Sequence, residues 1–178
     1  MTPFPEKLRT SRLVLQRLST GMEAPLQAVF EAAGDHFTTV TGRPEPEPDA
    51  AERELRSAEA VEGREVLLIR LSESDEPIGA VGFWERHPAP EIALLGMLLI
   101  DRRHRGQGYA REALASLEET LRNRGVQELR TGVGAGDVRR HEVLRALGFS
   151  AADERRHVSL DRGRVMIAIF QKEIPPAE

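Results

Sequence analysis

The sequence predicts an α/β protein with one domain: a mixed, mostly antiparallel sheet flanked by about four helices, in the order βααβββαβαββ. Three observations lead to this prediction. The chain has 178 residues, a length typical of one domain. Segments with alternating apolar residues are interspersed with segments in which apolar residues recur every three or four positions. No internal repeat divides the chain, so we expect one domain over 1–178 with a core at about 9–172.

The first third of the chain predicts one strand and two helices. The alternation in Arg12–Leu18 is typical of a strand. An amphipathic helix follows, from about Thr20 to Ala33. Alternating prolines exclude a regular helix over 41–50. Asp49 is a good capping residue for a charged helix over about 50–62.

The middle of the chain predicts three strands and a helix. The strands are Val66–Leu71, Pro77–Trp84 and Ile92–Ile100. The third is apolar enough to lie in the centre of the sheet. Gly96 lies in its middle, and a glycine inside a strand often marks a bulge or a close backbone approach. The helix, Ala110–Arg124, has apolar residues at helical spacing and ends before a glycine.

The last third predicts a strand, a helix and a hairpin. Val126–Val133 is typical of a strand, and Val138–Leu147 of a helix that ends at a glycine. The strands His157–Leu160 and Val165–Phe170 flank Asp161–Gly163, which is a hairpin signal.

Composition excludes several classes of protein. Hydrophobic residues make up 40% and charged residues 30%, with a net charge of −4, so nothing indicates nucleic acid or an anionic membrane as a partner. The chain has no cysteine, which excludes disulfides, thiolate metal sites and a cysteine nucleophile. The histidines show no metal-ligand spacing, so we expect no metal. No signal peptide or membrane span is apparent, and we expect a cytoplasmic protein.

A turn with two glycines is the most informative segment. It joins the apolar strand that ends at Ile100 to the following helix, and it contains Gly106 and Gly108. Glycines let a ligand approach the backbone closely, and the first N–H groups of a helix point outward and favour phosphate. Four arginines lie on or next to the turn: Arg102, Arg103, Arg105 and Arg111. The segment therefore predicts an anion site.

Here the sequence resembles the GNAT superfamily of N-acetyltransferases. Arg103-His-Arg-Gly106-Gln-Gly108 matches its signature of Gln or Arg, two residues, Gly, one residue, and Gly or Ala. Leu147-Gly148-Phe149 matches a later family segment, and the element order matches from about Arg9 to Lys172. Thr10–Leu18 also looks like the start of the branch that acetylates ribosomal-protein N-termini and some small amines.

The resemblance implies acetyl-CoA as co-substrate, bound in a V-shaped gap beside the strand Ile92–Ile100 that a bulge at Gly96 opens. It implies that the pyrophosphate lies on N–H groups from about Arg103 to Tyr109. The N–H of Leu99, or one close to it, would polarise the thioester carbonyl. The implied cofactor-binding residues are Leu98, Ile100, Arg103, His104, Arg105, Gly106, Gln107, Gly108, Tyr109, Ala110, Asp137 and Arg140.

The chain departs from the family at two positions. Asp137 stands where the family often has Asn; it can cap a helix but cannot donate an amide hydrogen bond. Leu144 stands where the family often has a tyrosine that protonates the departing thiolate. The only tyrosine, Tyr109, is interpreted as core packing. A thiol pKa of about 8.5 makes a dedicated acid helpful rather than necessary.

The reaction implied is direct attack of a primary amine on acetyl-CoA. An amine of pKa about 10 must lose a proton first. Glu91 is the candidate base, with Glu85 and His87 as rivals, and each is alternatively an ordinary charged or loop residue. Trp84 is a candidate for either the acceptor cleft or the core.

The acceptor has no motif of its own. An acidic loop, with Glu45, Glu47 and Asp49, suggests a cationic amine of a small molecule or a peptide N-terminus. Arg139 and Arg140 either contact phosphates or lie on the surface. A non-catalytic acyl-CoA sensor and an interaction domain of the same fold stay open as alternatives. The protein is expected as a monomer or homodimer.

Overall fold

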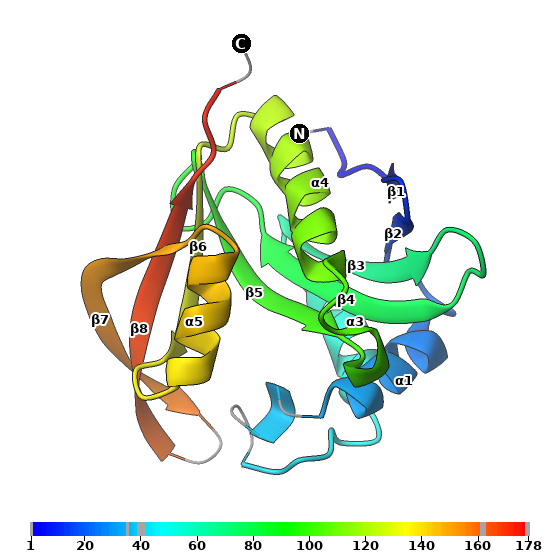
Figure 1. The fold of residues 1–178 in the computed structure, drawn as a ribbon, viewed down its shortest axis with the longest axis horizontal. Helices are drawn as coiled ribbons and strands as arrows, with labels where there is room; N and C mark the ends of the chain where they lie inside the picture. Colours follow the sequence, from blue (N-terminus) through cyan, green and yellow to red (C-terminus); the bar gives the residue numbers. More distant parts are fainter. Residues whose placement is uncertain (1, 35, 39–41, 161–162, 177–178) are drawn as a thin grey trace.

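One eight-stranded sheet organises the protein, in the order β1-β2-β3-β4-β5-β6-β8-β7 (Figure 1). The computed structural model describes residues 2–34, 36–38, 42–160 and 163–176. All neighbouring strands are antiparallel except β5 and β6, which are parallel. The predicted mixed α/β class is therefore confirmed. The strands are β1 Lys7–Arg9, β2 Leu13–Arg17, β3 Arg64–Leu71, β4 Pro77–Trp84, β5 Ile92–Ile100, β6 Glu128–Gly134, β7 Ser150–Leu160 and β8 Gly163–Glu173.

Helices cover both faces of the sheet (Figure 1). They are α1 Glu23–Ala33, α3 Ala50–Ala60, α4 Tyr109–Asn123 and α5 Val138–Ala146, with a short 3₁₀ helix, η1, at Arg102–His104. The side chains of α4 and α5 enter one core, and those of α1 and α3 enter a second core on the opposite face. None of the helices described in the structure is long and apolar enough to cross a membrane.

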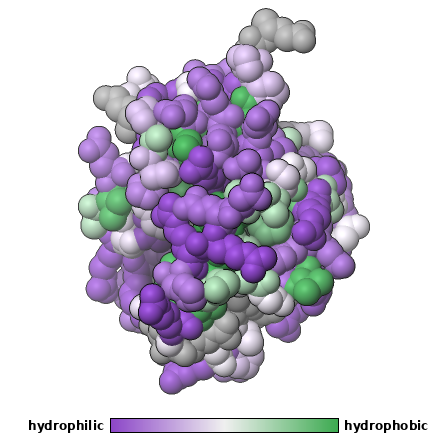
Figure 2. Space-filling model, turned by 90° about the vertical axis from the view of Figure 1, so that its left-hand side faces the viewer, coloured by the Kyte–Doolittle hydropathy of each residue, from purple (hydrophilic) through white to green (hydrophobic). Residues whose placement is uncertain are grey.

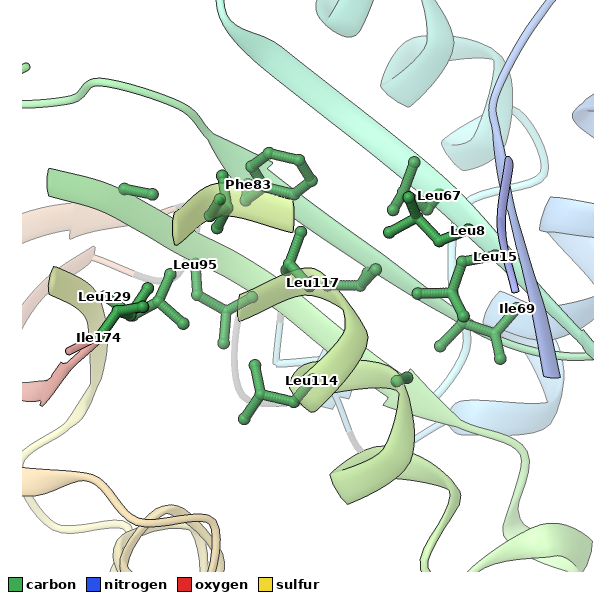
Figure 3. Packing of buried hydrophobic residues seen from close by; sticks show 14 of the residues in the cluster. Leu8, Leu15, Leu67, Ile69, Phe83, Leu95, Leu114, Leu117, Leu129 and Ile174 are labelled. Atoms are coloured by element: carbon green, nitrogen blue, oxygen red, sulfur yellow. The ribbon is translucent and has the colours of Figure 1, made fainter. Parts of the chain in front are cut away.

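The core under α4 is built by helical spacing. Leu114, Leu117 and Leu121 of α4 are buried, as the sequence pattern predicts. Leu117 packs among residues from the strands, including Phe83 and Leu95 (Figure 3). Burying a leucine side chain contributes roughly 1.5–3 kcal/mol, so this helix is held to the sheet mainly by its apolar face.

The bulge expected at Gly96 is present. Gly82 pairs with Met97, whereas Phe83 pairs with Leu95, so Gly96 is an extra residue on β5. An extra residue reverses the alternation of side chains between the two faces of a sheet. Consequently Leu95 belongs to the α4 core, while Met97 belongs to the α1 and α3 core.

Beyond the bulge, β5 and β6 separate. Only Ile92–Leu94 and Glu128–Arg130 are paired, although the strands continue to Ile100 and Gly134. Figure 1 shows the two strands starting together and diverging. This confirms the gap expected beside β5.

Four details differ from the sequence prediction or lie outside the structure. β1 was not predicted, because three residues are too few to show a period. The strands of the hairpin are longer than expected, and β7 bulges between Ala151 and Arg155. Asp49 precedes α3 but makes no side-chain cap bond. Asp161 and Arg162 of the predicted turn lie outside the described residues.

The side of the molecule that carries β7 and α5 is mainly hydrophilic (Figure 2).

Candidate active site

The glycine turn, residues 101–108, leads from β5 into α4. The Asp101 carboxylate accepts a hydrogen bond of 2.9 Å from the N–H of Arg103, and the main-chain oxygen of Asp101 accepts one from His104. Gly106 and Gly108 have φ of 74° and 83°, a conformation that glycine adopts at little cost. A Cβ at Gly106 would meet nothing within 4 Å. The backbone of the turn is therefore open at Gly106.

The main-chain N–H groups of residues 106–111 form a run without internal acceptors. In the described part of the chain, the first donor of α4 to find a main-chain carbonyl is Glu112, which bonds Gly108. Arg103, His104 and Arg105, which were expected to contribute, donate instead to acceptors within the turn. The expected run is therefore displaced by about three residues. The stretch Arg105-Gly-Gln-Gly108-Tyr-Ala110 satisfies the same family signature and agrees with this register.

The arginines of the turn have structural partners. Arg103 pairs with Asp101 at 2.6 Å and with Glu76 at 3.5 Å. The hydrogen bond from Arg103 outweighs burial and holds the pKa of Asp101 below its usual value. The guanidinium of Arg105 donates to the main-chain oxygens of Ile100, at 2.9 Å, and Ala33, at 3.2 Å. Arg105 therefore joins the turn to the end of α1.

Arg12, from the loop between β1 and β2, is the cation beside the glycines. Its Nη2 lies 3.4 Å from where a Cβ of Gly108 would be, and its Nη1 donates to the Gln107 oxygen at 3.0 Å. The guanidinium also lies 4.4 Å from the centre of the Tyr109 ring and pairs with Glu112 at 2.6 Å. Sequence reasoning missed Arg12 because no local spacing links it to a turn 95 residues away. Tyr109 packs against the core, as interpreted.

The main-chain N–H and C=O groups of β5 point alternately toward β4 and toward the gap. The N–H of Asp101 donates to Ile78 at 2.7 Å, and alternate residues of an antiparallel strand bond the same neighbour. The N–H of Leu99, which pairs with Ala80, therefore faces β4. Leu99 was expected as the donor to the thioester, but its N–H is turned toward β4. The N–H groups of Leu98 and Ile100 face away from β4 and replace it as candidate donors.

The expected bases lie at the closed end of the gap. The main-chain oxygen of Glu91 accepts bonds from Gln127, at 2.7 Å, and Glu128, at 3.1 Å. Five residues of strand, about 16 Å at 3.3 Å per residue, separate Glu91 from Gly96. Glu85 is buried, and its carboxylate accepts a hydrogen bond of 2.8 Å from Arg124 Nε. His87 is bonded to Ile92 through its N–H. The structure does not bring these three residues to the glycine turn.

A cross-strand row marks where the gap begins. Trp84, Leu94 and Arg130 are successive partners across β4, β5 and β6. Their neighbours Phe83, Leu95 and Leu129 point into the α4 core, so the row lies on the opposite face. A Cβ at Gly96 would lie 2.7 Å from Cζ3 of Trp84. The half-buried indole therefore covers the bulge.

The start of α5 borders the open end of the gap. Asp137 caps this helix by accepting from the N–H of Arg140 at 3.1 Å, as expected. Leu144 is buried in the α4 core. A hollow of about 540 Å³ is lined by Asp137, by Thr38, by the preceding turn and by the start of β8. Among the residues the structure describes, no group of His, Asp and Glu could hold a metal ion.

Known structures share this fold over almost the whole chain. An acetyltransferase from Thermus thermophilus is 24% identical, with a TM-score of 0.73 over 94% of this chain and 99% of that one. A GCN5-related N-acetyltransferase from Brucella melitensis is 17% identical, with a TM-score of 0.77 over 96% and 80%. RimL, a ribosomal alpha-N-protein acetyltransferase in complex with coenzyme A, is 14% identical, with a TM-score of 0.73 over 96% and 97%. At these identities the likeness establishes the fold.

Sequence comparison establishes the family. No curated protein matches the chain in sequence. A sequence model described as "Acetyltransferase (GNAT) family" matches residues 26–149, which includes β3 to β6, the glycine turn and α5. The chain belongs to the GNAT family of acetyltransferases.

Proposed function

We propose that the protein transfers an acetyl group from acetyl-CoA to a primary amine by direct attack. One observation carries this proposal: within the described residues, six consecutive main-chain N–H groups, 106–111, lack internal acceptors at the start of α4, which follows the unpaired end of β5. N–H groups at a helix start, together with the helix dipole, favour phosphate. Family membership and the structural likeness to a CoA-bound enzyme support the same cofactor.

The residues of the turn fit a pyrophosphate. Gly106 presents no side chain, so its backbone is open to a ligand. Arg12 adds a cation beside Gly108, and charge-assisted bonds to phosphate are stronger than neutral ones. Asp137 and Arg140 at the start of α5 complete the proposed cofactor contacts, together with Leu98 and Ile100 of β5. The pantetheine arm would then lie along the unpaired part of β5.

The N–H of Leu98 is the proposed donor to the carbonyl oxygen, where negative charge develops. The N–H of Ile100, about 7 Å farther along the strand, would bond the pantetheine arm instead. The lone pair of the amine attacks the carbonyl carbon, the C–S bond breaks, and the sulfur leaves as the CoA thiolate. The proton lost from nitrogen goes to water, and Glu91 at the start of β5 is the candidate base that accepts it through that water. Leu144 supplies no acid, and a thiolate of pKa about 8.5 leaves without one.

Two glycine variants test the cofactor site. Gly106 and Gly21 both have positive φ, 74° and 95°, and a Cβ at either would meet nothing within 4 Å. Gly106→Glu places a carboxylate beside the proposed phosphates, whereas Gly21→Glu does not, although the backbone strain is similar. Calorimetry with CoA should show about a hundredfold weaker binding for Gly106→Glu only. Equal binding by both variants would remove the basis of the proposal.

A second measurement separates the enzyme from an acyl-CoA sensor. The buried Leu144 and the displaced bases favour the sensor as the alternative function. Thiol release from acetyl-CoA is followed with a panel of primary amines. Amine-dependent release supports the transferase. Tight CoA binding without release, with every amine in the panel, would instead establish the sensor.

A further inference from the structure

The sheet face opposite α4 is apolar on both sides of the gap. On one side lie Trp84 and Leu94, the first two members of the cross-strand row. On the other side lie Ile167 and Ile169 of β8; a Cβ at Gly132 of β6 would be 2.8 Å from Cγ2 of Ile167 and 3.7 Å from Cδ1 of Ile169. The two isoleucines therefore lie over β6. We call these four half-buried side chains the apolar patch.

Trp84 is held in place rather than free to reorient. The Arg64 guanidinium lies 4.6 Å from the indole centre, and Arg64 is paired with Glu54 of α3. The Cζ3 edge of the indole lies against Gly96. A rigid aromatic side chain at the start of the gap gives a bound molecule apolar area at little entropic cost.

Carboxylates outnumber arginines beside the patch, and Arg156, the cross-strand partner of Ile167, is paired with Glu154. The Arg130 side chain is hydrogen-bonded to the Glu128 carboxylate. Glu173 is the residue opposite Glu128 on the neighbouring strand β8. The hydrogen bond to Glu128 raises the pKa of Arg130, and the charges of Glu154 and Glu91 act in the same direction. A molecule with a single positive charge and an apolar body complements this combination.

The acidic loop before α3 offers less attraction for cations than its sequence suggests. Glu47 pairs with Arg43 at 2.8 Å, and Asp49 pairs with Arg53 at 3.2 Å. Two of its three carboxylates are thus compensated by arginines. Recognition of a polycationic acceptor therefore gains little support from this loop.

We infer that the apolar patch binds the acceptor, and that the acceptor is a small monoamine with an aromatic or branched alkyl body. This inference rests on the proposed function. The amine group would lie between Gly96 and Leu98, within reach of the carbonyl carbon, and the carbon skeleton would lie against the indole and the two isoleucines. Polyamines and aminoglycosides fit poorly, because their polar groups would lose water against apolar side chains.

The test compares acceptors and variants in the thiol-release assay. 2-Phenylethylamine and isoamylamine should have lower KM values than spermidine or kanamycin. In the double variant Ile167→Thr/Ile169→Thr, KM for 2-phenylethylamine should rise roughly tenfold, while KM for acetyl-CoA is unchanged. Val61→Thr, an exposed apolar residue outside the patch, is the matched control and should behave as the wild type. Thermal melting confirms that both variants are folded.

Fluorescence gives a readout independent of turnover. Trp84 is the only tryptophan in the chain, so its emission reports directly on the patch. Isoamylamine added to the CoA-saturated protein should shift the emission, and spermidine should not. Faster turnover of spermidine, kanamycin or a peptide N-terminus than of monoamines overturns the inference but leaves the transferase intact. An emission shift without turnover supports the patch and removes the transferase.

Discussion

Leu95 and Met97 lie two residues apart on β5 and bury their side chains in opposite cores. In a regular strand they would share a face. Their partners on β4, Phe83 and Gly82, are consecutive residues, so Gly96 is an extra residue between Leu95 and Met97 and reverses the faces to which the side chains at the end of β5 point. The same residue lies two positions beyond the last pair between β5 and β6, Leu94 and Arg130. One glycine thus accounts for the change of face and lies where the gap opens.

Replacing this glycine with alanine should therefore be costly. Gly96 does not have a positive φ, so alanine is allowed by the backbone. Its Cβ would nevertheless lie 2.7 Å from the Trp84 ring, which must move. We expect Gly96→Ala to lower the free energy of unfolding by about 1–3 kcal/mol, measured by urea denaturation, and to change the tryptophan emission.

The control for this substitution is Gly136→Ala. A Cβ at Gly136 would meet nothing within 4 Å, and its φ is not positive either. This variant should unfold within about 0.5 kcal/mol of the wild type. Equal stability of the two variants would show that Trp84 does not pack against the bulge.

How far sequence predicts this protein depends on the range of the interaction. The order of strands and helices follows from local periodicity, and the bulge follows from a glycine within an apolar strand. The choice of main-chain donors does not follow from a local pattern. Asp101 accepts hydrogen bonds from the N–H groups of Arg103 and His104, so the N–H groups without internal acceptors begin only at Gly106. Glu91 and Arg12 are placed by strand register and loop packing, which no local motif encodes.

The buried carboxylate of Glu85 should make its partner essential for stability. Its side chain is 2% exposed and accepts a hydrogen bond of 2.8 Å from Arg124 Nε. Without Arg124 the nearest cation among the described residues is Arg86, whose Nε lies 3.8 Å from the carboxylate, beyond hydrogen-bond distance. Breaking a buried ion pair costs about 3–5 kcal/mol. We expect a loss of this size for Arg124→Met in chemical denaturation.

A surface ion pair provides the comparison for Arg124. Arg56 pairs with Glu52 on the exposed side of α3, and such solvent-exposed pairs contribute little to stability. Arg56→Met should therefore be nearly neutral. A loss for Arg124→Met as small as this would mean that the Glu85 carboxylate does not depend on Arg124 for its stabilisation.

Glu112 should make the protein sensitive to acid. Burial disfavours its charged form, but hydrogen bonds from Thr10 and Arg12 outweigh burial and hold the pKa of Glu112 below the ordinary 4.5. Because the folded pKa is lowered, the stabilisation is complete above the unfolded pKa. It is lost as pH falls through the folded value.

The variant Glu112→Gln tests this sign. Its free energy of unfolding should be lower than that of the wild type at pH 7, and the difference should shrink as pH falls below about 4. Urea denaturation across this range measures both effects. Glu119→Gln, at an exposed position on the same helix, should follow the wild type at every pH. A constant difference for Glu112→Gln would contradict the lowered pKa.

Arg12 should contribute more to CoA affinity than Arg103, although only Arg103 belongs to the sequence motif. Arg12 lies beside Gly108 and is paired with one carboxylate, that of Glu112, whereas Arg103 is shared between the carboxylates of Asp101 and Glu76. Losing a charge-assisted bond to phosphate costs about 1.5–3 kcal/mol. Arg12→Met should therefore weaken CoA binding at least tenfold by calorimetry, and Arg103→Met should change it less than threefold. Arg12→Lys keeps the charge but not the planar fork, so it should recover part of the affinity. If Arg12→Lys binds no better than Arg12→Met, Arg12 acts by bracing the turn through Glu112 and Gln107 rather than by contacting phosphate.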